Sequence, residues 1–180
     1  MIIKKIILFF LSALVLLGAS SFSWQVQSDV LEYNVKAAFL YRFSDYVEGN
    51  SLNTDENFNI AILGNSNIIK PLKAIASDKR IKNKRINVRQ YNDAVDITGS
   101  CQMVFVSKNY SSSIESVAAL LYGKPMLIIA EQNGGCAKGA HINFFTSENK
   151  LKFEVNLRSS RRSGLKISSQ LLQHASIYNN

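Results

Sequence analysis

Three short apolar runs, separated by segments of helical periodicity, constrain the fold of this chain more than any other feature. The runs are residues 58–63, 103–106 and 126–130, and each has the length and composition of a strand buried inside a sheet. Residues 68–76 and 112–121 lie between them and carry apolar side chains at helical spacing. Strands and helices that alternate in this way form a largely parallel, Rossmann-like sheet with helices on both faces. We therefore predict an α/β fold.

The remaining periodic segments add to the edges of this sheet. Residues 85–91 alternate polar and apolar side chains, which predicts a strand with one solvent-exposed face. Residues 140–146 and 150–156 flank a polar turn, so we expect an antiparallel C-terminal hairpin beside the parallel strands. The chain then ends with a short helical turn over residues 158–163 and a last helix that begins at Ser168.

A further helix is predicted over residues 29–47, with Asp29 as its N-cap and Glu32 as the capping-box partner. Apolar side chains that recur at helical spacing are expected to face the sheet. In this segment they are Leu31, Val35, Ala38, Phe39, Phe43 and Tyr46.

Residues 1–23 have the organisation of a secretory signal peptide. Two lysines near the start precede an apolar run over residues 6–17, and small residues follow it. The run is shorter than the roughly 20 residues of a membrane-spanning helix. We expect cleavage after Ser21 or Ser23 and one exported domain over residues 24–180, with an uncleaved N-terminal anchor as the alternative.

Charge and cysteine content narrow the classes of partner. A chain of 180 residues with 47% hydrophobic content suits one globular domain. Without Lys4 and Lys5 it keeps 19 basic and 13 acidic residues, an excess that favours acidic partners or anionic surfaces. Nucleic acid is not an expected partner, because basic residues with interleaved aromatics do not cluster.

Cys101 and Cys136 are not expected to form a disulfide with each other within one chain, and a disulfide between chains stays open.

Residues suited to catalysis are scarce. The chain has two histidines, His141 and His174, and no serine in a nucleophile-elbow pattern, so we predict no catalytic residues and no enzyme activity. Cys136 and His141 lie five residues apart, but a structural zinc site needs four ligands. We therefore predict no metal site and no cofactor.

Arg158, Arg161 and Arg162 are the candidate partner-binding residues. On a helical turn they lie close together, and such a cluster can hold a carboxylate or phosphate through paired hydrogen bonds. The alternatives are an ion pair with Glu154 or another acidic side chain, or a solvated face. A phosphate-binding turn at residues 64–67 is not expected, because the glycine pattern of nucleotide-binding loops is missing.

Two motifs resemble those of a known family. Residues 33–43, Tyr-Asn-Val-Lys-Ala-Ala-Phe-Leu-Tyr-Arg-Phe, resemble the opening motif of the YfiR-like family. Residues 153–172, from Phe-Glu-Val-Asn-Leu to Ser-Ser-Gln-Leu-Leu, are similar to its closing motif. Cys101 before the 103–106 run, and residues 139–144, fit the order of the family between these motifs.

The resemblance implies a function. YfiR-like proteins are small, non-catalytic periplasmic domains that restrain an inner-membrane diguanylate cyclase through its periplasmic part, which lowers cyclic-di-GMP and biofilm formation. An OmpA-like outer-membrane protein can sequester them, and some relatives are input domains of sensor kinases. For this chain, a homodimer is left open. The chain departs from the family at Gly49-Asn50, where a Trp-Pro pair is common, and at Gln102, where histidine is common.

A periplasmic small-ligand-binding or sensor-input domain is the alternative function. In an open α/β sheet, ligands bind in the crevice beyond the carboxyl ends of the strands. Gly64 and Glu131 each follow one of the predicted buried strands, so they would flank such a crevice.

Overall fold

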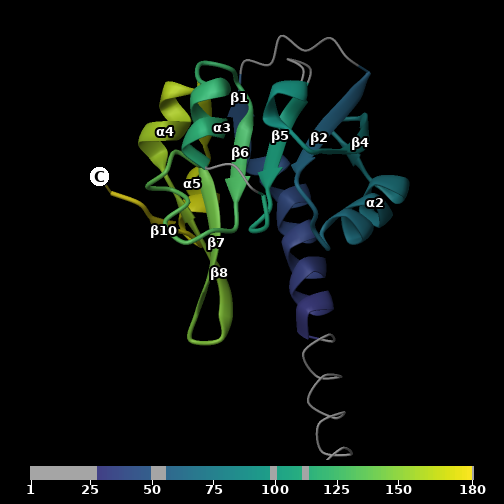
Figure 1. The fold of residues 1–180 in the computed structure, drawn as a ribbon, viewed down its shortest axis with the longest axis horizontal. Helices are drawn as coiled ribbons and strands as arrows, with labels where there is room; N and C mark the ends of the chain where they lie inside the picture. The colour runs from purple at the N-terminus through teal and green to yellow at the C-terminus, as the bar shows by residue number, and fades with distance from the viewer. Residues whose placement is uncertain (1–27, 50–55, 98–100, 111–113, 180) are drawn as a thin grey trace, which may run out of the picture.

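The protein folds around one twisted sheet in the computed structural model, which describes residues 28–49, 56–97, 101–110 and 114–179 (Figure 1). Eight strands of the described residues form this sheet, in the order β10-β8-β7-β6-β5-β2-β4-β3. Their bounds are β2 Asn57–Leu63, β3 Arg80–Ile81, β4 Lys84–Tyr91, β5 Cys101–Val106, β6 Leu127–Ala130, β7 Ile142–Ser147, β8 Lys150–Val155 and β10 Ser176–Ile177. The predicted strands are therefore present, and β3 and β10 are short additions at the edges.

The centre of the sheet is parallel and its C-terminal part contains the predicted hairpin. Strands β4, β2, β5, β6 and β7 pair in parallel, and β7 and β8 pair antiparallel. Glu148 and Asn149 connect the hairpin with φ angles of 53° and 57°. A two-residue turn with positive φ at both positions matches the twist of the flanking strands and fixes their register. The predicted α/β fold class is confirmed.

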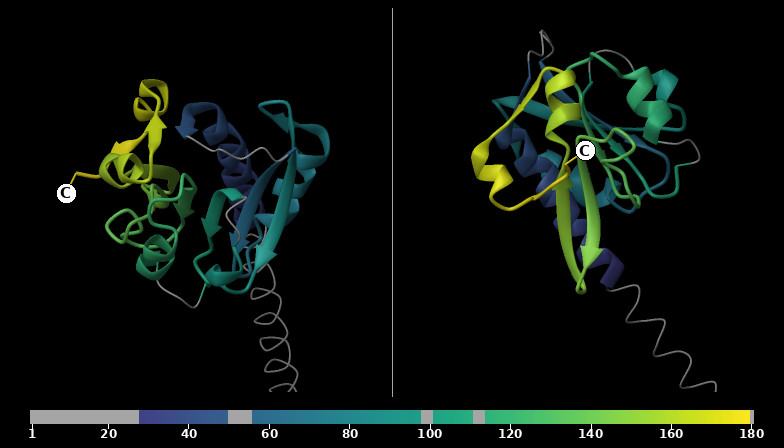
Figure 2. Two further views of the ribbon diagram at one scale, coloured as in Figure 1. Left: turned by 90° about the horizontal axis from the view of Figure 1, so that it is seen from above. Right: turned by 90° about the vertical axis from the view of Figure 1, so that its left-hand side faces the viewer.

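Helices cover both faces of the sheet (Figures 1 and 2). The N-terminal helix, residues 28–46, and α2 (Ile69–Asp78) contribute to one hydrophobic cluster, and α3 (Ile114–Leu120) and the 3₁₀-helical turn η1 (Ala94–Asp96) contribute to the other. Successive side chains of β2 alternate between these clusters: Ile60 and Ile62 join the first, and Ala61 and Leu63 join the second. This alternation explains why each central strand is apolar throughout.

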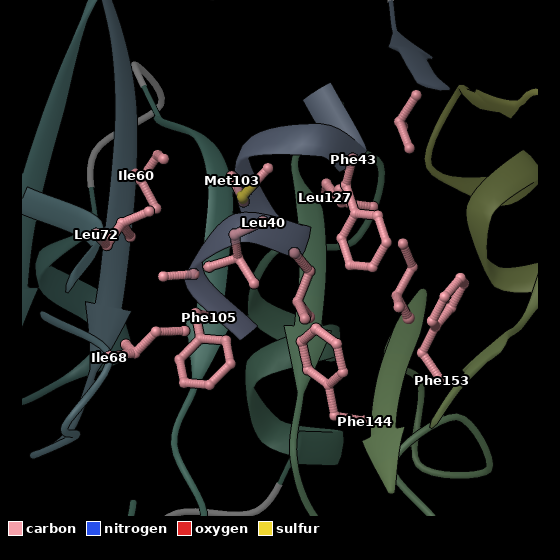
Figure 3. Close-up of a cluster of buried hydrophobic side chains, with 14 of the residues drawn as sticks. Leu40, Phe43, Ile60, Ile68, Leu72, Met103, Phe105, Leu127, Phe144 and Phe153 are labelled. Atoms are coloured by element: carbon pink, nitrogen blue, oxygen red, sulfur yellow. The ribbon is translucent and has the colours of Figure 1, made fainter. Parts of the chain in front are cut away.

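An aromatic cluster joins the N-terminal helix to the hairpin (Figure 3). The ring centroid of Phe43 lies 5.8 Å from that of Phe144 and 5.2 Å from that of Phe153. Phe39 of the same helix lies 5.5 Å from Phe153. Aromatic pairs at these separations add to the stabilisation that burial of their area provides.

The predicted inward face of the N-terminal helix is partly wrong. Leu31 and Val35 are 63% and 39% exposed, and Ala38 is also exposed. The side chains of this helix that are buried are Tyr33, Lys36, Ala37, Leu40, Phe43 and Ser44. The face is rotated because it includes the charged Lys36, which apolar periodicity cannot register.

The ends of that helix also differ from the prediction. Residue 28 is already helical, so Asp29 is not the N-cap. The helix ends at residue 46, and β1 (Val47–Gly49) follows it. Strand β1 pairs antiparallel with β9 (Leu165–Ile167), an unpredicted contact that ties the end of this helix to the C-terminal segment.

The C-terminal segment contains two short helices. These are α4 (Leu157–Arg162) and α5 (Ser169–Leu172), which Ser168 caps by accepting a hydrogen bond from the Leu171 amide. Because α5 ends at Leu172, His174 lies beyond the helix in which it was expected. His141 likewise precedes β7 and does not belong to it.

The predicted signal peptide over residues 1–23 lies outside the described residues, so its cleavage and the domain bounds 24–180 stay predictions. Within the described part of the chain, the helices lack either the length or the apolar character that crossing a bilayer requires. Both cysteines are buried and are not bonded to each other. Cys101 packs in the cluster under α3, whereas the Cys136 Sγ atom lies 3.6 Å from the carbonyl oxygen of Glu154.

Candidate partner-binding surface

Helix α4 carries the three candidate arginines and is held firmly against the loop that precedes β7. Asn156 is its N-cap: the side-chain Oδ1 accepts a hydrogen bond from the Ser159 amide at 2.8 Å. The Asn156 Nδ2 donates to the carbonyl of Cys136 at 2.9 Å, and the Ser159 hydroxyl donates to the carbonyl of Gly139 at 2.9 Å. The side-chain hydrogen bonds of Asn156 and Ser159 therefore fix the position of α4 and of the arginines that it carries.

Arg158, Arg161 and Arg162 are all exposed and form no ion pair with an acidic side chain of the described residues. The alternative ion pair with Glu154 is not formed, and Glu154 Oε1 instead accepts a hydrogen bond from Asn143 Nδ2 at 3.0 Å. Arg162 lies over the ring of Tyr122, 5.4 Å from its centroid, which is a cation–π arrangement. The surface thus presents positive charge that the described part of the fold does not neutralise.

Two hollows flank α4, and Arg158 and Arg162 line both of them. A cavity of about 360 Å³ is lined by Arg158 and Arg162 together with Tyr122, Tyr178 and small residues. A second, more open hollow of about 630 Å³ is lined by all three arginines, Tyr178 and Asn179. Arg161 therefore lines only the second hollow, and this separates its role from those of its neighbours.

His141 lies at the buried side of the smaller cavity and is held as a neutral ring. Its Nδ1 accepts a hydrogen bond from the Ile128 amide at 2.9 Å, so the ring proton resides on Nε2, which lies 3.1 Å from the Ser163 hydroxyl. Burial lowers the pKa of His141 to about 4. The ring therefore donates to Ser163 and cannot accept its proton, which makes the pair unsuited to activating a serine nucleophile.

Cys136 and His141 both line this cavity, but neither is arranged as a metal ligand. Burial, with the Glu154 carboxylate nearby, raises the pKa of the Cys136 thiol, which disfavours the thiolate that binds metals. Both ring nitrogens of His141 are engaged. Within the described residues, three or more potential metal-binding side chains do not gather at any point.

A buried ion pair occupies the strand ends where the alternative ligand crevice was expected. The Lys36 Nζ atom lies 2.6 Å from Glu131 Oε2 and 2.5 Å from Glu32 Oε1. Glu131 Oε1 also accepts hydrogen bonds from the Lys108 amide and the Tyr33 hydroxyl. Desolvation lowers the pKa of Lys36, but the hydrogen bonds to Glu131 and Glu32 outweigh it, so the net pKa is raised. The carboxylate of Glu131 is therefore already satisfied by the protein.

At the neighbouring strand end, Gly64 adopts a φ of +81° and packs against Ser107. The buried Ser107 hydroxyl has no hydrogen-bond partner among the described residues. A side chain at position 64 would meet this hydroxyl at 2.7 Å, so the close approach requires glycine.

Sequence reasoning located the arginines but missed Tyr122, Tyr178 and Ser163. Tyr122 lies in the turn after α3, Tyr178 in the C-terminal tail and Ser163 directly after α4, so only the tertiary fold brings them together. Lys36 had a local signal, because Glu32 lies four residues before it on the same helix.

These features define a small α/β domain that presents an unneutralised arginine surface beside a cavity. The chain belongs to the YfiR/HmsC-like family, whose model matches residues 33–176. A solved structure described as a conserved domain protein from Vibrio cholerae O1 biovar El Tor strain N16961 is similar in fold, with a TM-score of 0.53 and 12% sequence identity. The match covers 67% of this chain and 54% of that one. A search of curated proteins found no significant match.

Proposed function

We propose that this protein is a non-catalytic periplasmic regulator that binds the periplasmic part of an inner-membrane diguanylate cyclase and represses it. Membership of the YfiR/HmsC-like family over residues 33–176 carries the proposal. The exposed arginines of α4 support it, because they offer a charged surface without an internal ion-pair partner in the described part of the chain. Repression lowers cyclic-di-GMP and with it biofilm formation.

The proposal requires export. The basic start, the apolar run and the small residues of positions 1–23 support a cleaved signal peptide, followed by one domain over residues 24–180. Intact-mass measurement of the protein recovered from the periplasm is expected to give a chain that begins near Phe22 or Trp24. A mass that retains residues 1–20 would contradict export by cleavage.

Repression of this kind is a shift of the cyclase between an active and an inactive state. The regulator must therefore bind the inactive state more tightly than the active one. A preference of about 100-fold corresponds to about 2.7 kcal/mol, which a few charge-assisted hydrogen bonds from arginine side chains supply.

Substitution of the arginines tests the proposed contact. The variants Arg158→Ala and Arg161→Ala are expected to raise cyclic-di-GMP in cells while the thermal midpoint stays within a few degrees of the wild type, because neither side chain has an internal ion pair to lose. Arg89→Ala, on the exposed face of β4, is the matched control and is expected to keep full repression. Loss of stability together with repression would assign the arginines a structural role instead.

One further partner follows from the same family resemblance. We expect an OmpA-like outer-membrane protein to sequester the regulator and so relieve repression. A homodimer of the protein is the second association left open. Crosslinking in intact cells followed by mass spectrometry tests both contacts, and recovery of the cyclase alone would remove both from the account.

A further inference from the structure

We infer that the smaller cavity beside α4 is a binding site for a small organic anion bearing a carboxylate or phosphate group. Its volume of about 360 Å³ lies within the range of about 300–1,000 Å³ that small-molecule sites occupy. A single acidic side chain of a partner fills much less space, so the cavity suits a whole small ligand better. The cavity shares Arg158 and Arg162 with the surface proposed to contact the cyclase, but binding of a ligand to it can be measured without the cyclase.

The charges around the cavity all favour an anion. Arg158 and Arg162 are four residues apart on α4, so their guanidinium groups lie on one side of it, and both line the cavity. No acidic side chain of the described residues lines this cavity. The bound anion would therefore be the first negative partner that these two arginines acquire within the described structure.

The walls of the cavity suit the uncharged body of such a ligand. Tyr122 and Tyr178 supply aromatic surface, and Arg162 already lies over the Tyr122 ring. The ring of His141 is neutral, because its Nδ1 accepts a hydrogen bond from the Ile128 amide, and with Nε2 engaged by Ser163 it adds neither charge nor a free acceptor. The small side chain of Ala119 at the exposed rim leaves the entrance open.

Occupation of the cavity gives the regulator a means of control. An anion held by Arg158 and Arg162 occupies two of the three arginines proposed to contact the cyclase and offsets part of their positive charge. The ligand is then expected to weaken the complex with the cyclase, a consequence that rests on the proposed function, whereas binding of the ligand itself does not.

Nuclear magnetic resonance titration of the mature protein tests the site directly. Inorganic phosphate and citrate serve as the phosphate and carboxylate probes, each compared with sodium chloride at equal ionic strength. At least one probe is expected to give saturable shifts centred on the side-chain Nε–Hε groups of Arg158 and Arg162 and on the Tyr122 amide. Shifts no larger than those with chloride, or spread evenly over all basic residues, would overturn the inference.

Matched variants distinguish binding of the anion in the cavity from general electrostatic attraction to the basic surface. Replacing both Arg158 and Arg162 with alanine is expected to weaken binding by about tenfold or more, as the loss of charge-assisted hydrogen bonds predicts. Arg161→Ala removes the same kind of charge outside the cavity and is expected to change affinity by less than about threefold. An equal loss in Arg161→Ala would contradict the assignment to this cavity.

A variant that fills the cavity with a larger side chain keeps both arginines and removes the volume available to the ligand. Ala119→Phe is expected to abolish saturable binding without disturbing the core, because Ala119 is exposed at the rim. Unchanged binding in this variant would place the anion elsewhere. The titration contains no cyclase, so a failure of the site is distinguishable from a failure of the proposed repression.

Discussion

The Nζ atom of Lys36, in the middle of the N-terminal helix, lies 2.6 Å from Oε2 of Glu131, the residue that follows β6. The side chains are only 6% and 2% exposed. Taking two such charges out of water costs several kcal/mol each, and the pair persists because Glu32, the Lys108 amide and the Tyr33 hydroxyl complete its hydrogen bonds. The pair therefore fixes how this helix sits on the carboxyl ends of the central strands.

Breaking this pair on one side is expected to destabilise the protein more than replacing both partners. Glu131→Leu removes one of the two carboxylate partners of the buried Lys36 ammonium group and is expected to lower the free energy of unfolding by about 3 kcal/mol, with a similar loss for Lys36→Met. The double variant is expected to lose less than the sum, because it removes both buried charges together. Urea denaturation measures all three.

The exposed pair of Lys152 and Glu148, 3.8 Å apart on the hairpin, is the matched control. The same substitutions there are expected to change stability by less than about 1 kcal/mol. Strictly additive losses at Lys36 and Glu131 would show that the two side chains do not stabilise each other.

Stability is expected to fall with acidity because of His141. Burial lowers its pKa from 6.5 to about 4, so between these values the unfolded chain holds a proton that the folded chain lacks. The free energy of unfolding then decreases by about 1.4 kcal/mol per pH unit as the pH falls through this window. Above pH 6.5 His141 is neutral in both the folded and the unfolded chain, so the stability that the neutral ring contributes is fully present.

Urea denaturation between pH 4 and pH 7 measures this dependence, and two histidine variants isolate it. His141→Gln is expected to be less stable at neutral pH and to lose this part of the pH dependence, whereas His174→Gln, at an exposed position, is expected to retain it. Equal slopes for wild type and His141→Gln over this window would show that another group is responsible.

In the loop before β7, replacing Gly135 with a residue that has a side chain is expected to destabilise the protein. A Cβ atom there would overlap with Oδ1 of Asn143, whose side-chain amide already accepts from the Gln132 amide and donates to Glu154. Gly135→Ala is therefore expected to lower stability by about 1–3 kcal/mol, measured by thermal or urea unfolding.

The adjacent glycine provides the control for that loop. Gly134 has a φ of +68° and nothing within 4 Å of an added Cβ, and asparagine tolerates this conformation better than other residues. Gly134→Asn is expected to be the milder change. The reverse order of stability would show that backbone conformation, and not contact with Asn143, decides what this loop accepts.

The sheet was predictable because its central strands are apolar on both faces and its turns have strong local signals. The face of the N-terminal helix was not, because burial of Lys36 depends on Glu131, which lies 95 residues further along the chain. A pattern of apolar side chains consequently placed Leu31 and Val35 inward, although both are exposed. A long-range ion pair can override local periodicity in this way.

The candidate surface was predictable in its charge but not in its shape. The arginines lie within one short segment, so the sequence alone reveals them. The cavity beside them also needs Tyr122, His141 and Tyr178, which come from three other parts of the chain. The pairing of β1 with β9 was missed for a similar reason, because strands of three residues carry no readable periodicity.

The central claim is that this protein represses a diguanylate cyclase, and the cellular concentration of cyclic-di-GMP in a clean deletion strain tests it most directly. The account predicts that cyclic-di-GMP and surface attachment rise when the gene is deleted, and that further deletion of the cyclase abolishes the rise. An unchanged concentration of cyclic-di-GMP in the deletion strain, under conditions in which the wild type expresses the protein, would contradict the account.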